Sequence, residues 1–243
     1  MSEDEWHALA AFTPARIALG RAGNALPTRR VLEFQLAHAR ARDAVHAPFE
    51  AAALATALGA IRLETQAANR EDYLANPDRG RRLNDASRAR LVRGAFDAAL
   101  VIADGLSATA IHAHGAALAR LILARLPELN WAPVAVVTNG RVAIGDEIAQ
   151  AFGADLAVVA IGERPGLSAA DSVGLYLTWR PCPGATRDAE RNCISNVRPD
   201  GLAPDEAAHR LAWLARQARR LGLTGIGLKE DAPGRLTDGG AQA

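Results

Sequence analysis

The chain has 243 residues, 49% of them hydrophobic, and a net charge of +1 from 28 Lys and Arg against 27 Asp and Glu. This composition supports a large buried core, and the near-zero charge argues against nucleic acid or an anionic membrane as partner. The sequence has no apolar run of the roughly 18 residues that a membrane span requires, and its acidic N-terminus is unlike a secretion signal. The only cysteines, Cys182 and Cys193, favour a reducing compartment over a disulfide framework, so we expect a cytoplasmic protein.

The first 95 residues show helical patterns and predict a helical N-terminal domain. Thr28 is expected to cap a helix that starts near Arg29 and has Leu32, Leu36 and Ala39 on one face. The other expected elements are a helix within Ala51–Leu63, a turn at Asn76–Gly80 and a helix over about Ala86–Ala98.

From residue 96 onward, strand and helix patterns alternate. Strands are expected at Leu100–Ala103, Val134–Val137, Leu156–Ile161 and Leu175–Trp179, and helices over about Ser107–Leu126, Asp146–Phe152 and from Pro204 to a stop at Gly222. This alternation predicts a second domain, residues 96–243, with a Rossmann-like, mainly parallel sheet and helices on both faces. The chain is therefore assigned to the α/β class, with a polar C-terminal tail from Asp231.

Three of the expected strands end in polar, glycine-containing loops. These loops are Asp104–Ser107, Thr138–Arg141 and the Gly-Glu-Arg-Pro-Gly segment at 162–166. Ligands of open α/β sheets bind where such loops follow the carboxyl ends of strands, which makes Val142 and Glu163 candidate contacts. The alternative for Glu163 is an exposed ion pair with Arg164, which would contribute little to stability.

Other polar groups have plainer interpretations. His112 and His114 would point about 200° apart on a helix, so they are not expected to share a metal ion. Cys193 has no histidine near it in sequence and is expected to be a small packed residue rather than a nucleophile.

Two arginine-containing segments leave a choice open. The Gly20–Gly23 segment lacks the spacing of a dinucleotide-binding loop and is either a turn or an arm that contacts a partner or an anion through Arg16 or Arg21. The arginines of the Asp78–Arg82 segment form either a solvated surface or a clamp for phosphate or carboxylate groups.

Several segments resemble the small subunit (light chain) family of ethanolamine ammonia-lyase, over residues from about 15 to about 226. They are Ala15–Gly23, Leu74–Leu83, Asp104–Ser107, Gly140–Val142, Gly162–Leu167 and Asn192–Asn196. The most specific feature is Gly-Glu-Arg-Pro-Gly-Leu followed some thirty residues later by Cys-Ile-Ser-Asn.

The resemblance implies an adenosylcobalamin-dependent lyase that converts ethanolamine to acetaldehyde and ammonia by radical chemistry. It also implies a large TIM-barrel subunit as partner, six copies of each subunit, and a cofactor held between them. Carried onto this sequence, the cobalamin contacts are Val142, Glu163 and Cys193, with neither catalytic nor metal-binding residues on this chain. The complex would be cytoplasmic, either free or inside a bacterial microcompartment.

Two other functions remain open on the residues alone. One is a stand-alone doubly wound enzyme that binds a nucleotide or another cofactor, which rests on fold analogy. The other is a structural assembly subunit without ligand contacts.

Overall fold

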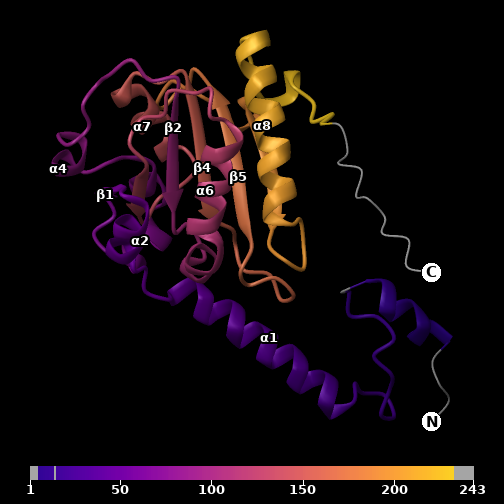
Figure 1. Cartoon of the computed structure of the whole chain (residues 1–243). Coiled ribbons are helices and arrows are strands. Elements are labelled where there is room, and N and C mark those ends of the chain that lie inside the picture. Colours follow the sequence, from indigo (N-terminus) through magenta and orange to yellow (C-terminus); the bar gives the residue numbers. More distant parts are fainter. Residues whose placement is uncertain (1–4, 14, 233–243) are drawn as a thin grey trace.

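The computed structural model of the protein describes residues 5–13 and 15–232, and its centre is one six-stranded sheet (Figure 1). The strand order is β1-β3-β2-β4-β5-β6, with the first four strands parallel and β5 antiparallel to both of its neighbours. The strands are β1 (Ile61–Glu64), β2 (Ala98–Ala103), β3 (Ala135–Thr138), β4 (Leu156–Gly162), β5 (Val173–Trp179) and β6 (Arg191–Val197). The predicted α/β class with a mainly parallel sheet is confirmed.

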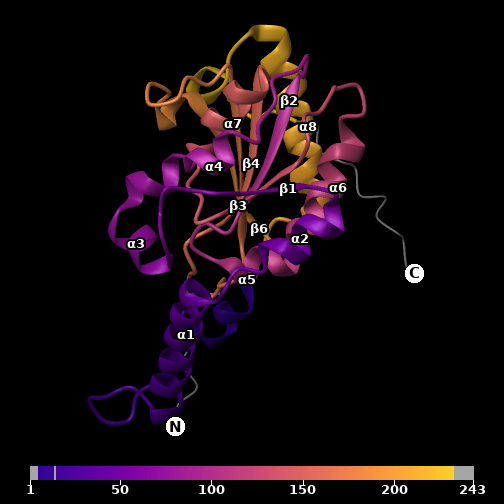
Figure 2. The same cartoon turned by 90° about the vertical axis from the view of Figure 1, so that its left-hand side faces the viewer.

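Helices cover both faces of this sheet (Figure 2). The helices of the described chain are α1 (Thr28–His46), α2 (Ala51–Leu58), α3 (Arg70–Ala75), α4 (Asp85–Arg88), α5 (Ala108–Ala110), a π-helical turn (Ile111–Gly115), α6 (Ala116–Arg125), α7 (Ile144–Phe152) and α8 (Pro204–Leu221). Short 3-10 helices lie at Glu5–Phe12, Pro77–Arg81, Asp188–Glu190 and Gly225–Gly227. Helices α2, α6 and α8 pack on one face, and α7 packs on the other. None of the described helices is both long and apolar enough to cross a membrane.

The core follows from the continuous apolar runs of the central strands. Every residue of β2 and β4 is buried, as expected of parallel strands that are covered on both faces. Gly145 allows α7 to approach β4 closely, because a Cβ atom there would overlap the Val159 side chain. The sheet and α7 therefore form a rigid support for the loops at the ends of the strands.

The predicted elements after residue 99 are largely confirmed. All four expected strands are present, and residues 108–125 form a continuous helical segment with the π-helical turn inside it. Gly222 ends α8 in the left-handed conformation at a φ of 70°. The sequence analysis missed β6, and Cys193 therefore lies in an edge strand and not in a loop. The predicted tail falls mostly outside the described residues.

The helix expected within Ala51–Leu63 is confirmed as α2, which stops at Leu58 because Gly59 takes a left-handed φ of 60° and residues 61–64 pair with β3 as β1. Two other predictions before residue 99 are wrong. The helix expected over Ala86–Ala98 is only the short α4, since Ala98 already belongs to β2 and pairs with β4. Thr28 is the first residue of α1 and provides no side-chain cap. The domain boundary near residue 95 stays a prediction, although the sheet takes β1 from the first segment.

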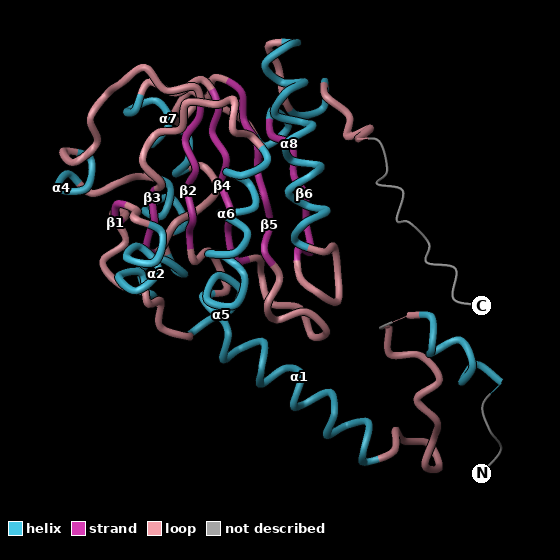
Figure 3. The backbone as a smooth tube through the Cα atoms, viewed as in Figure 1, coloured by secondary structure: helices cyan, strands magenta, loops and turns pink. Residues whose placement is uncertain are grey.

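The long helix α1 extends away from the sheet, with the N-terminal segment beside its far end (Figure 3). The predicted apolar stripe on this helix is present but not packed, because Leu32 and Leu36 are 58% and 52% exposed. An isolated helix of this length is marginal in water unless another surface covers its apolar side chains.

Candidate functional site

The crevice expected between the loops after β2 and β4 is closed. Leu106 donates a backbone hydrogen bond to the Gly162 carbonyl at 2.9 Å. A Cβ atom on Gly162 would overlap the carbonyl oxygen of Ser107, and one on Gly105 would overlap that of Gly162. The two loops thus pack on each other where a doubly wound enzyme would bind a nucleotide, which argues against the nucleotide-binding alternative.

An ion pair and several hydrogen bonds connect the polar groups next to this closed crevice. The Asp104 carboxylate lies 3.1 Å from the Arg70 guanidinium and accepts a hydrogen bond from the Gly140 backbone at 3.2 Å. Asp104 is almost completely buried, and this burial raises its pKa to about 6 despite the attraction of Arg70. The network joins the ends of β2 and β3 and is structural.

The raised pKa predicts a pH dependence of stability. The Asp104 carboxyl has a pKa of about 3.9 in the unfolded chain and about 6 in the folded one. At pH values between these two, the folded state therefore binds more protons than the unfolded state. The free energy of unfolding should therefore fall by about 2 to 3 kcal/mol as pH rises from 4 to 6.5. Urea unfolding across this window should show a flatter profile for Asp104→Asn than for wild type. Asp155→Asn, in an exposed ion pair, is the matched control, and a profile of Asp104→Asn parallel to wild type would contradict the assignment.

One face of the sheet is left uncovered over β5 and β6. Cys193 of β6 is paired with Tyr176 of β5, so their side chains share this face, and Cys193 is exposed while Tyr176 is partly buried. Burial and hydrogen bonding to Cys193 raise the pKa of Tyr176, so its hydroxyl is a neutral donor at pH 7. Ser195 extends the same surface, with its hydroxyl 3.3 Å from the Cys193 sulfur.

Glu163 lies at the end of this uncovered face. A Cβ atom on Gly174 would lie 3.1 Å both from the Glu163 carboxylate and from the Tyr176 ring, so the glutamate side chain crosses β5 above a glycine. The carboxylate accepts a hydrogen bond from the Asn196 backbone at 3.1 Å. Glu163 therefore has a fixed position and is not an exposed partner of Arg164.

The third candidate contact, Val142, lies just before the start of α7. It packs against the core cluster that also contacts Tyr176, so it belongs to the same side of the sheet. We call the surface made by Tyr176, Cys193 and Ser195 the shelf, and the buried Gly174 lies beneath the Glu163 side chain at its end. The structure thus places Glu163 and Cys193 around Tyr176, with Val142 on the same side. Sequence reasoning missed Tyr176 and Gly174, although strand alternation puts them opposite the buried Leu175 and Leu177.

The shelf provides shape and neutral hydrogen-bonding groups rather than catalytic groups. Within residues 5–13 and 15–232, no cluster of three or more His, Cys, Asp or Glu residues could hold a metal ion. The predicted separation of the two histidines is confirmed, because His112 accepts a hydrogen bond from the Glu50 backbone and His114 pairs with Asp171. Cys182 and Cys193 are both free thiols, but the prediction that Cys193 is a packed residue is wrong, because its side chain is exposed on β6.

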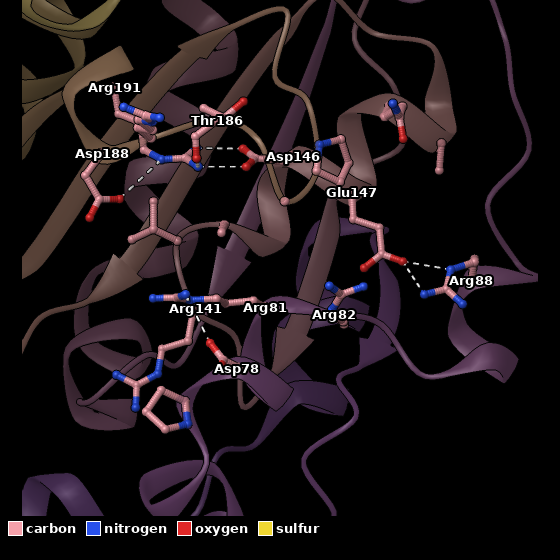
Figure 4. Close-up of a pocket in the computed structure, with 18 of the residues that line it drawn as sticks. Asp78, Arg81, Arg82, Arg88, Arg141, Asp146, Glu147, Thr186, Asp188 and Arg191 are labelled. Atoms are coloured by element: carbon pink, nitrogen blue, oxygen red, sulfur yellow. Dashed lines mark hydrogen bonds and ion pairs between the residues drawn. The ribbon is translucent and has the colours of Figure 1, made fainter.

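A second feature on this side of the sheet is a groove along α7 with a volume of about 1170 Å³ (Figure 4). Val142 and Ala143 line one end of it, and the 3-10 helix at Pro77–Arg81 and the loop before β6 lie along its sides. The buried Asp146–Arg191 pair, with contacts of 2.6 and 2.7 Å, joins α7 to β6 beside the groove.

Comparisons with known proteins agree on one family. A family model described as ethanolamine ammonia-lyase light chain matches residues 3–229. An ethanolamine ammonia-lyase small subunit from Azotobacter vinelandii is 50% identical over 251 residues, which cover 98% of this chain and 93% of that protein. Proteins of the same name from Ralstonia nicotianae and Pseudomonas aeruginosa are each 50% identical over 254 residues, covering 99% of this chain and 93% and 92% of those proteins.

Proposed function

The chain belongs to the ethanolamine ammonia-lyase light chain family, and on this premise we propose that it forms one side of an adenosylcobalamin site whose other side is a large subunit. The complex would convert ethanolamine to acetaldehyde and ammonia. The observation that carries this proposal is the shelf, an uncovered part of a sheet face that has neutral polar groups and, among the described residues, no cluster that could hold a metal ion.

The residues of the shelf fit a corrin ring. A flat macrocycle needs a surface without large projecting side chains, and the exposed Cys193 and Ser195 of β6 are both small. The corrin rim carries neutral amides, which suit a neutral tyrosine hydroxyl, a serine hydroxyl and backbone groups. In the part of the chain that the structure describes, β6 is the last strand of the sheet, and one of its edges pairs with no other strand.

Each candidate residue would help to position the cofactor. Val142 would contact the cofactor from the end of α7, and Cys193 would support it from β6. Glu163 would border the site through its loop, which is held by a hydrogen bond from its backbone to the Ser172 carbonyl at 3.0 Å. When bound, adenosylcobalamin would supply a radical through homolysis of its cobalt–carbon bond. The role of this chain is to hold the cofactor, orient it and exclude water.

Reconstitution tests the proposal. The purified chain alone should show neither ethanolamine turnover nor the visible spectrum of bound cobalamin. Co-expressed with its large subunit, it should restore both. Turnover by the isolated chain, or a large subunit that binds cobalamin and turns over fully without it, would contradict the proposal.

A further inference from the structure

The groove along α7 has more arginine than the function proposed above explains. Seven of the residues that line it are arginines and four are acidic: Arg81, Arg82, Arg88, Arg93, Arg141, Arg187 and Arg191, against Asp78, Asp146, Glu147 and Asp188. The groove therefore has an excess of three positive charges in a protein whose net charge is only +1.

The acidic residues are already used by specific arginines. Figure 4 shows Asp146 paired with Arg191, Glu147 with Arg88 and Asp78 with Arg81. Asp188 lies 3.7 Å from the same Arg191. These contacts neutralise one set of guanidinium groups and leave another set without a carboxylate.

Arg82, Arg93, Arg141 and Arg187 form that second set. None of them has an ion pair with any residue in the described part of the chain. Arg141 lines the groove and is held in place by stacking on the Tyr73 ring at 4.3 Å and by a long hydrogen bond of 3.4 Å from its Nη2 to the Tyr73 carbonyl. A guanidinium that is positioned in this way and has no carboxylate partner is suited to an external acceptor with anionic oxygens.

We infer that the α7 groove is a binding site for a phosphate group, with Arg82 and Arg141 as its principal donors. Planar guanidinium groups match the oxygens of phosphate, and a stacked arginine is already oriented for such contacts. Val142 is one of the residues that line the groove, so the proposed cobalamin site and the phosphate site would share it. If the proposed function holds, on which this inference rests, the phosphate group is the phosphodiester of the cobalamin nucleotide tail. The other source of a phosphate group is a free phosphate compound.

Comparison of two cofactors tests the inference in the reconstituted complex. Adenosylcobinamide has the corrin ring but lacks the phosphodiester and the base. Arg82→Gln should weaken adenosylcobalamin binding about tenfold, because a charge-assisted hydrogen bond is lost, and should leave adenosylcobinamide within twofold. Arg82→Lys should recover part of the loss. Arg220→Gln, an exposed arginine on α8 across the sheet, is the matched control and should change neither affinity.

The outcomes separate the two proposals. Equal weakening of both cofactors by Arg82→Gln, or weakening of neither, would overturn a cobalamin phosphate site. If wild type binds neither cofactor, the proposed function fails, and titration of the chain with inorganic pyrophosphate then tests the groove alone. Thermal stabilisation of wild type but not of Arg82→Gln would assign the groove to a free phosphate compound, and no stabilisation would overturn the inference.

Discussion

Replacing Arg191 with methionine should lower the free energy of unfolding by about 3 to 5 kcal/mol. The Arg191 and Asp146 side chains are 3% and 2% exposed and form a two-point ion pair, so the variant would leave a buried carboxylate without its partner. The pair also joins β6 to α7, and its loss should loosen the strand that carries Cys193. Urea unfolding of the purified chain measures the change.

The matched control for this variant is Arg180→Met. Its ion pair with Asp155 is largely exposed, and the change should cost less than about 1 kcal/mol. The double variant Arg191→Met with Asp146→Leu should be more stable than Arg191→Met alone, because it removes both buried charges. Equal stability losses for Arg191→Met and Arg180→Met would show that the buried pair has no special structural role.

Replacing Cys193 with tryptophan should abolish cofactor binding, with an affinity loss of at least about 100-fold, while the fold and subunit assembly persist. The side chain is exposed in a strand, where an aromatic residue is well tolerated, so the stability change should stay within about 1 kcal/mol. Its bulk would stand on the shelf where the corrin ring is proposed to lie. Equilibrium titration of the reconstituted complex with adenosylcobalamin measures the effect.

Two control variants separate the effect of bulk on the shelf from the effects of losing the thiol and of adding bulk elsewhere. Cys193→Ser keeps the size of the side chain and should retain near-normal turnover, whereas a nucleophilic cysteine would not tolerate the change. Arg62→Trp introduces the same bulk at an exposed position of β1, on the opposite edge of the sheet, and should leave binding unchanged. Normal cofactor affinity in Cys193→Trp would instead favour a purely structural subunit.

Helices and strands that have a local sequence pattern were predicted best. The runs that became β2 and β4 are continuously apolar, and Gly222 ends α8 where a helix stop was expected. Prediction from the sequence failed for strands that form through pairing with another part of the chain. Residues 61–64 form a strand only because they pair with β3. Strict alternation is absent from β6, because its buried residues, Arg191, Ile194 and Val197, are three positions apart and its pairing with β5 shifts register.

The candidate site was predictable to a similar degree. Val142 and Glu163 follow strand ends, so a general rule for α/β sheets pointed to them, whereas Cys193 came from family resemblance alone. The sequence could not predict that Gly162 and Ser107 would pack together and close the expected crevice, because that contact depends on two loops 55 positions apart. The role of Tyr176 likewise depends on strand register, which local patterns do not determine.

A structure of the assembled complex with adenosylcobalamin is the most direct measurement of the central claim. We expect density for the corrin ring against the shelf, with contacts to Val142, Glu163 and Cys193 from this chain and the remaining contacts from the large subunit. A corrin ring enclosed by the large subunit alone, with the shelf facing solvent, would contradict it.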